Sequence, residues 1–306
     1  MSWKNLKKQY YIIVEKIKNK KNFSNDWLNF QKLALQISKK PPQAIFEIQK
    51  SLEIIEKKKP KSRIRIFDHG CGGGLKAIYL AAIGYKNVYG VNVNFDVFFI
   101  NKILKTKFRV SEIRFFKTKG KGVPFKKNFF DFIISAQVLE HLTDEEVFLY
   151  YSEEGRILKE NGLAYHEVPH KYIPYESHSR LWLIHLFPYF CKPFLYGLFL
   201  SIQKKKNLFL KGRYYAEYFS KNFLILRSPH SHKKMLTKNI GSFRDLTYDR
   251  LLREEDFSSY DNDSPILLRK FIQKLFKIPL LGKFLAIICK NFFILQTLSK
   301  KVKNNL

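Results

Sequence analysis

A glycine-rich turn between a β-branched run and an apolar run constrains the fold of this chain more than any other feature. Residues 63–67 read RIRIF, residues 68–74 read DHGCGGG, and an apolar stretch follows. The glycines let the backbone turn sharply and approach a ligand closely, while a helix after them presents its N-terminal amides. The segment therefore predicts a strand, a ligand-binding turn and a helix from Leu75 to Ile83.

A second run, at residues 129–142, reads FFDFIISAQVLEHL. Its first half is the continuous apolar run of a strand that is buried on both faces, and its second half passes directly into a loop and a helix. In an open parallel sheet, ligands bind beyond the carboxyl ends of the strands, where Asp68, Asn92, Ser135 and Val168 would emerge. The two runs are therefore expected to contribute to one site.

Together the two runs resemble class I S-adenosylmethionine-dependent methyltransferases. In that family D-x-G-x-G-x-G is the loop under the cofactor, and F-D-x-(I/V)-x-S-x-x-V-L-E-H is the fourth strand with its following loop. Residues 88–94 look like the second strand, 123–125 like the L-P-F before strand four, and 161–165 like the turn into strand five. The resemblance covers residues 42–170. The segment after it, from His170, is similar to an insertion found in methyltransferases of surface-polysaccharide gene clusters.

The resemblance implies S-adenosylmethionine as the cofactor and assigns residues to it. The loop beneath the methionine part and the ribose would comprise Asp68, Gly70, Cys71, Gly72 and Gly74. The methionine side would be lined by Ser135, Ala136 and Gln137, and the ribose and adenine positions correspond to Asn92 and Lys119.

Two of these residues depart from the family pattern. The family usually ends its second strand with an acidic residue that accepts from both ribose hydroxyls, whereas this chain has Asn92. An amide lacks the charge assistance of a carboxylate, and a lysine at position 119 cannot accept a hydrogen bond from the adenine amine. These departures keep open the alternative of a membrane-associated binding protein that has lost turnover.

Alternation of short β-rich runs with helical stretches predicts an α/β fold: a Rossmann-like, seven-stranded, mostly parallel sheet with helices on both faces. The expected strands are 63–68, 87–92, 112–117, 129–135 and 162–168, followed by 241–246 and 292–298. We expect a helical cap at 1–60, the cofactor-binding core at 61–170, an apolar substrate-side insertion at 171–235, and completion of the sheet at 236–306.

Composition limits the partners and the compartment. The chain has 306 residues and a formal net charge of +30, which invites an anionic membrane or nucleic acid. No nucleic-acid module is visible, so RNA is a weaker candidate substrate than the two small-molecule classes named below, and nucleic acid is not expected as a partner. Three widely spaced cysteines without a C-x-x-C pair favour a reducing cytoplasm and predict no metal site. The sequence does not predict the oligomeric state.

Two apolar segments raise the question of a membrane. Residues 181–202 are long enough to span a bilayer, but His185, Pro188, Lys192 and Pro193 interrupt them. We therefore expect two short helices that pack on the fold, enclose a substrate or lie at a membrane surface. Residues 267–277 have the spacing of a basic amphipathic helix, which either packs on the sheet or attaches the protein to anionic lipid at the inner face of the membrane.

Histidine suits the removal of a proton from a hydroxyl acceptor. The candidates for catalysis are His141, His170 and His178, with His166 as a further histidine near the expected strand end. The sequence therefore predicts a methyltransferase that acts at oxygen on a sugar or lipid-linked intermediate of cell-surface polysaccharide synthesis. Methylation of a quinone-like lipid or another small molecule is the alternative.

Overall fold

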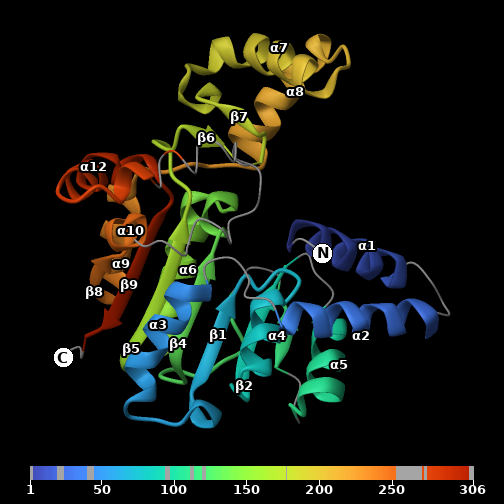
Figure 1. The fold of residues 1–306 in the computed structure, drawn as a ribbon, viewed down its shortest axis with the longest axis vertical. Helices are drawn as coiled ribbons and strands as arrows, with labels where there is room; N and C mark the ends of the chain where they lie inside the picture. The colour runs from blue at the N-terminus through green and yellow to red at the C-terminus, as the bar shows by residue number, and fades with distance from the viewer. Residues whose placement is uncertain are drawn as a thin grey trace.

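The structure of the chain, a computed structural model, describes residues 3–18, 24–39, 45–93, 97–110, 114–118, 122–176, 178–252, 271 and 274–302. Its main sheet has seven strands in the order β3-β2-β1-β4-β5-β9-β8 (Figure 1). The strands are β1 (Arg65–His69), β2 (Asn87–Asn92), β3 (Phe115–Lys117), β4 (Phe130–Ala136), β5 (Leu158–Val168), β8 (Gly241–Asp245) and β9 (Leu295–Lys301). The first five are parallel, whereas β9 is antiparallel to both β5 and β8. The predicted fold class is confirmed.

Most strand boundaries differ from the sequence prediction by one to four residues, and β5 and β9 are two examples. β5 begins at Leu158 rather than 162, and a register irregularity lies opposite it between Phe130 and Phe132. β9 begins at Leu295 rather than 292, because residues 290–292 continue the preceding helix as a short 3-10 turn. Of the expected strand at 112–117, residues 112 and 113 lie outside the described part of the chain.

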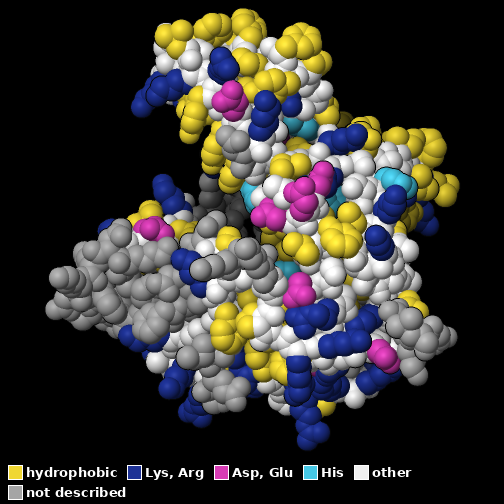
Figure 2. Space-filling view, turned by 180° about the vertical axis from the view of Figure 1, so that it is seen from behind, with side chains coloured by type: hydrophobic (Ala, Val, Ile, Leu, Met, Phe, Trp, Pro, Cys, Tyr) yellow, Lys and Arg dark blue, Asp and Glu magenta, His cyan; other side chains and the backbone are white. Residues whose placement is uncertain are grey.

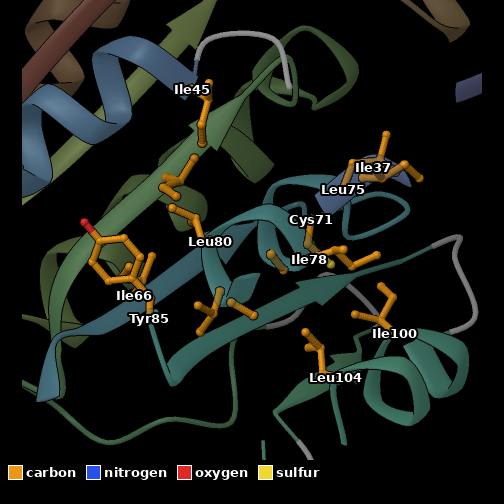
Figure 3. Close-up of a cluster of buried hydrophobic side chains, with 14 of the residues drawn as sticks. Ile37, Ile45, Ile66, Cys71, Leu75, Ile78, Leu80, Tyr85, Ile100 and Leu104 are labelled. Carbon is orange, nitrogen blue, oxygen red and sulfur yellow. The ribbon is translucent and has the colours of Figure 1, made fainter. Parts of the chain in front are cut away.

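Helices cover both faces of the sheet because neighbouring strand residues point to opposite sides. Ile66 belongs to a buried cluster with helices α1 to α5, part of which Figure 3 shows, whereas Phe67 belongs to a second cluster with α6 and α9. The helices are α1 (Trp3–Lys18), α2 (Ser24–Ser38), α3 (Ile45–Glu56), α4 (Leu75–Ala82), α5 (Val97–Phe108), α6 (Asp144–Ile157), α7 (Lys192–Lys204), α8 (Gly212–Glu217), α9 (Pro229–Asn239), α10 (Thr247–Leu251) and α12 (Leu281–Cys289).

Residues 171–227 form a lobe that stands above the carboxyl end of the sheet (Figure 1). It contains the hairpin of β6 (Tyr175–Glu176) and β7 (Leu181–Trp182), then α7 and α8, and it has a small buried cluster of its own around Tyr196 and Leu200. The lobe starts and ends at one point, where the Lys171 backbone N–H donates to the Arg227 carbonyl over 3.0 Å. We name residues 171–227 the acceptor-side lobe.

The apolar segments differ in detail from the expectation of two short helices. Residues 181–202 contain a strand, two 3-10 turns and most of the single helix α7. None of the described helices combines the length and the apolar character that crossing a bilayer requires. Most of the expected basic helix at 267–277 lies outside the described residues, and α12 follows it.

Candidate functional site

The glycine turn after β1 lies where the strand order reverses, between β1 and β4. Gly70 and Gly74 have φ angles of +79° and +71°, a region that side chains with a Cβ rarely adopt. A Cβ at Gly70 would lie 2.5 Å from Val138, and one at Gly74 would lie 2.8 Å from Ile100. The turn therefore has its shape because glycine stands at these positions, and Gly74 directly precedes the first turn of α4.

Asp68 is the most informative side chain of this turn. It is 1% exposed, and neither of its carboxylate oxygens has a hydrogen-bond partner among the described residues. Burial raises the pKa of this carboxyl group, with Lys76 and His69 opposing the shift. A buried carboxylate without donors is unfavourable unless a ligand supplies them. The hydroxyl or amino groups of a bound cofactor fit this requirement.

Helix α1 packs directly on the glycine turn. The Tyr10 hydroxyl donates to the Gly73 carbonyl over 2.8 Å, and the Tyr11 ring lies beside Gly72 and Gly73. Cys71, also in the turn, is buried as a free thiol whose pKa is raised by burial. The N-terminal helices thus fix the outer side of the turn.

The second predicted motif lies at the end of β4, the strand next to β1. The Ser135 hydroxyl is buried and accepts from the Tyr150 hydroxyl over 2.8 Å, and Ala136 ends β4 beside it. Gln137 has a φ of +57°, and its side-chain amide donates to the Glu167 carboxylate over 3.1 Å. These contacts bring Ser135, Ala136 and Gln137 to the same sheet edge as Asp68. Their contact with a cofactor stays a prediction.

The two residues that depart from the family pattern have different outcomes. Asn92 is half-buried at the end of β2, and its backbone carbonyl accepts from the Thr118 N–H over 3.1 Å. Its position next to the glycine turn is secured by the Val91 carbonyl, which accepts from Gly70 and Cys71. Lys119 lies outside the described residues.

A buried ion-pair network lies beneath the turn and was not anticipated. The Glu154 carboxylate contacts His69 Nδ1 at 3.0 Å and His166 Nε2 at 2.7 Å. Burial raises the pKa of Glu154, but the two histidines outweigh burial and lower it to about 2. His166 is therefore a supporting residue inside the fold. Glu154 is separated from both histidines in sequence, which left no local signal for this network.

The three candidate catalytic histidines fall into two groups. His170 is buried: its Nε2 lies 2.8 Å from the Phe293 carbonyl, and its Nδ1 accepts from the Tyr172 N–H over 3.2 Å. Burial lowers the pKa of His170 to about 4, although the Phe293 carbonyl opposes this shift. Both ring nitrogens of His170 are engaged in contacts with the backbone where the lobe begins. This geometry does not favour His170 as the residue that accepts a proton from the substrate.

His141 and His178 lie together, with ring centroids 5.2 Å apart. His141 follows Glu140 in the turn after β4, and the sequence did not single out Glu140, although it stands in the second motif. Both Glu140 carboxylate oxygens are buried without a hydrogen-bond partner among the described residues, and burial raises the pKa of this group to about 8. The three side chains place their ligand atoms within 4.8 Å of one another.

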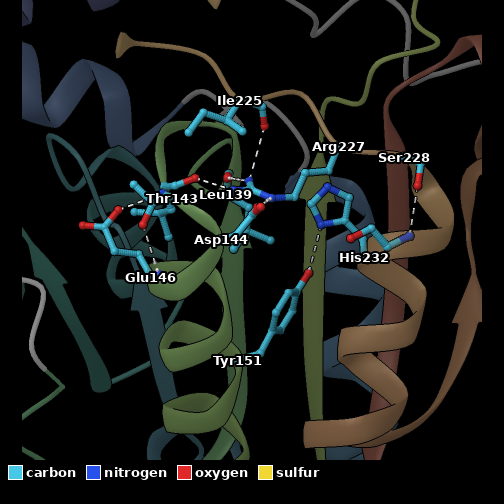
Figure 4. Close-up of polar contacts among 11 residues, drawn as sticks. Leu139, Thr143, Asp144, Glu146, Tyr151, Ile225, Arg227, Ser228 and His232 are labelled. Carbon is cyan, nitrogen blue, oxygen red and sulfur yellow. Dashed lines mark hydrogen bonds and ion pairs between the residues drawn. The ribbon is translucent and has the colours of Figure 1, made fainter. Parts of the chain in front are cut away.

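Arg227 fixes the turn that carries Glu140 and His141 (Figure 4). Its guanidinium donates to the carbonyls of Leu139 and Leu142 over 2.8 and 2.6 Å, and to the Asp144 carboxylate over 2.7 Å. Five donors in a fixed plane suit this arrangement, which a lysine cannot reproduce. The exit of the acceptor-side lobe is thereby attached to the end of β4.

The fold and this site define a class of enzyme. A seven-stranded, mostly parallel sheet has a glycine turn at the end of β1 and a buried carboxylate there without a hydrogen-bond partner among the described residues, as the resemblance to class I S-adenosylmethionine-dependent methyltransferases predicted. Residues 67–166 match the family model described as a methyltransferase domain, and they include both motifs. The chain is thus a methyltransferase with S-adenosylmethionine as its cofactor, as the sequence predicted.

Relatives and solved structures extend the comparison. A ubiquinone biosynthesis O-methyltransferase of Pelagibacter ubique strain HTCC1062 is 28% identical over 180 residues, 54% of this chain and 69% of the relative. One of Bartonella bacilliformis is 29% identical over 106 residues, 35% of this chain and 41% of that relative. The structure of geranyl diphosphate C-methyltransferase from Streptomyces coelicolor A3(2) is 13% identical, with 84% and 76% of the two chains covered and a TM-score of 0.44.

Proposed function

We propose that this methyltransferase acts on a hydroxyl group of a quinone-like lipid. The single observation that carries the proposal is that Asp68, whose carboxylate has no hydrogen-bond partner among the described residues, lies near the end of β1, while Glu140 and His141 of the cluster with His178 follow the neighbouring strand β4. The first suits the cofactor, and the second offers proton-accepting groups for a hydroxyl. The two relatives, both named ubiquinone biosynthesis O-methyltransferase, support this choice of acceptor.

The chain's own residues hold the reactants and exclude water. When bound, S-adenosylmethionine supplies an electrophilic methyl group. Asp68 accepts hydrogen bonds from the cofactor, and the glycine turn lets the backbone lie against it. Glu140, His141 and His178 would accept the proton of an acceptor hydroxyl that attacks this methyl group.

The acceptor-side lobe offers an apolar, basic surface for a lipid acceptor. Figure 2 shows hydrophobic side chains gathered over the lobe, and Leu210, Phe190 and Ile202 are 94%, 82% and 66% exposed. Residues 181–222 carry seven lysines and arginines against one glutamate. Apolar side chains flanked by lysines suit the surface of an anionic membrane. We therefore propose peripheral attachment at the inner face of the membrane, where a quinone-like lipid resides.

A lipid-linked sugar intermediate of surface-polysaccharide synthesis is the second candidate. Tyr175 and Trp182 pair across the β6–β7 hairpin with ring centroids 5.1 Å apart, and Trp182 is 42% exposed. An exposed aromatic face of this kind suits stacking on a sugar ring. The same lobe would then bind the lipid part of that acceptor.

Radiolabelled methyl transfer distinguishes the two acceptors. The protein is incubated on anionic vesicles with methyl-labelled S-adenosylmethionine and either a polyprenyl catechol or a polyprenyl-phosphate sugar. We expect label in the catechol, at rates well above those of the Asp68→Asn variant. Label in the sugar alone would replace the quinone-like acceptor with the second candidate. Cofactor binding without label in any acceptor would favour the binding-protein alternative.

A further inference from the structure

The cluster after β4 combines a carboxylate and two imidazoles in a ligand geometry. Among the described residues, Glu140, His141 and His178 are the group whose ligand atoms lie close enough to hold a metal ion, all within 4.8 Å. Glu140 Oε1 lies 3.8 Å from His141 Nε2. Ligands that are each about 2.1 Å from one ion lie roughly 3 to 3.5 Å apart, so small side-chain rotations complete such a site.

The burial of the Glu140 carboxylate indicates a ligand, apart from the distances within the cluster. The residue is 1% exposed, and neither carboxylate oxygen has a hydrogen-bond partner among the described residues. Its backbone carbonyl is satisfied by the Ile225 N–H at 2.7 Å, so only the side chain lacks partners. A buried carboxylate of this kind needs a cation or a proton.

Each histidine is oriented by a contact at its other ring nitrogen. His141 Nδ1 lies 2.8 Å from the Phe223 carbonyl, and His178 Nδ1 lies 2.8 Å from the Glu176 carboxylate. Metal-binding histidines usually have such a partner, which fixes the tautomer and leaves Nε2 for the ion. Glu176 is itself held by the backbone N–H groups of His178 and Ser179.

Contacts of Phe223 and Arg227 also hold the cluster in place before any ligand binds. The Phe223 ring packs on both histidines, with centroids 4.6 Å from His141 and 5.2 Å from His178. Arg227 fixes the carbonyls of Leu139 and Leu142 on either side of the Glu140–His141 pair. The ligands therefore come from two segments that are distant in sequence and are bound together by the end of the acceptor-side lobe.

We propose that Glu140, His141 and His178 bind a divalent transition-metal ion. Two imidazoles and one carboxylate suit Zn²⁺, Mn²⁺, Fe²⁺ or Co²⁺ and leave coordination positions open. His141 is exposed, so solvent and an acceptor reach the site from its side. With an ion bound, the three side chains act as its ligands and no longer accept the proton themselves; the ion would lower the pKa of a coordinated hydroxyl, whose proton would pass to solvent. This role rests on the O-methyl transfer proposed above, whereas the binding of the ion does not.

Cobalt binding tests the site without any acceptor. Tag-free protein is treated with a chelator and titrated with Co²⁺, and the visible absorption of the bound ion and the stoichiometry by calorimetry are recorded. We expect about one equivalent of Co²⁺ with the absorption of a nitrogen- and oxygen-ligated ion. Glu140→Gln and His178→Asn should each weaken binding at least tenfold. His230→Asn, which alters an exposed histidine on α9, is the matched control and should bind normally.

Two results would overturn the proposal. One is the absence of stoichiometric binding by the wild-type protein, and the other is unchanged binding in Glu140→Gln. The second result would mean that Glu140 is buried as a neutral carboxylic acid, as its raised pKa allows. Titration of the same metal-free protein with S-adenosylhomocysteine separates this failure from failure of the methyltransferase site, because the cofactor residues lie outside the cluster.

Discussion

The cofactor turn and the acceptor-side lobe follow opposite rules. The turn is largely buried, Gly70 and Gly74 leave no space for a side chain, and the key polar group, Asp68, is buried without a hydrogen-bond partner among the described residues. The lobe has a small buried core and exposes many of its large apolar side chains, such as Phe190 and Leu210. A cofactor of one shape requires fixed geometry, whereas the lipid acceptor proposed above would require an exposed apolar surface. The contrast predicts that substitutions in the two regions separate cofactor binding from membrane binding.

Asp68→Asn tests the cofactor side of the contrast most strongly. Loss of a charged acceptor of hydrogen bonds should weaken S-adenosylhomocysteine binding about a hundredfold, measured by calorimetry. The free protein should unfold no more easily, because the buried carboxylate has no hydrogen-bond partner in the part of the chain that the structure describes and its pKa is raised. Asp131→Asn is the control: its carboxylate pairs with Lys59 and Lys159, so stability should fall while affinity stays. Equal affinity of wild type and Asp68→Asn would contradict the assigned role.

Glu154→Gln tests the support beneath the turn. A pKa of about 2 in the folded protein, below the ordinary value of 4.5, stabilises the fold by about 3 kcal/mol above pH 4.5, as long as the two histidines that contact Glu154 are charged. This contribution is lost as the pH falls from 4.5 towards 2. Urea unfolding at pH 5.5 and pH 3.5 should therefore show that the variant has a lower free energy of unfolding than the wild type, and that the difference is smaller at pH 3.5. The half-exposed neighbour Glu153→Gln should have the smaller effect, and a deficit independent of pH would refute the explanation.

The lobe side of the contrast is tested by Phe190→Ser combined with Leu210→Ser. Both side chains are exposed, so the fold should be unaffected, but binding to anionic vesicles should weaken about tenfold in co-sedimentation. Affinity for S-adenosylhomocysteine should not change. Leu149→Ser, an exposed leucine on α6, provides the matched control. If the control variant loses as much vesicle binding as the lobe variant, the lobe is not the membrane surface.

Asn92→Asp is expected to have the smallest effect on cofactor affinity, and it tests whether residue 92 contacts the ribose. A carboxylate at the end of β2 would accept from ribose hydroxyls with charge assistance, which should tighten cofactor binding several-fold, by about 1 kcal/mol. Calorimetry should compare the cofactor affinity of this variant with that of Asn207→Asp, the same change in the lobe, which controls for a general effect of the added charge. Binding by the variant with none by the wild type would favour the binding-protein alternative. Weaker binding by the variant would show that Asn92 does not face the ribose.

Local patterns explain what the sequence predicted well. Consecutive apolar residues define β4, and the Asp68 turn requires glycine at sites that lie within a few residues of one another. Long-range pairing was not predictable, because no local signal connects Glu154 with His69, or Glu140 with His178. The apolar run at 181–202 is ambiguous for another reason. Periodicity identifies an apolar helix but does not say whether its side chains face a core, a substrate or solvent.

The closed base of the acceptor-side lobe makes it an interchangeable module. Its first and last residues, Lys171 and Arg227, are hydrogen-bonded to each other, so the chain leaves the sheet and returns at a single point. An insertion whose ends meet can change in length and composition without altering the strands beneath it. One catalytic platform can in this way acquire new acceptors by replacement of the segment between those two residues, while the residues that hold the methyl donor remain as they are.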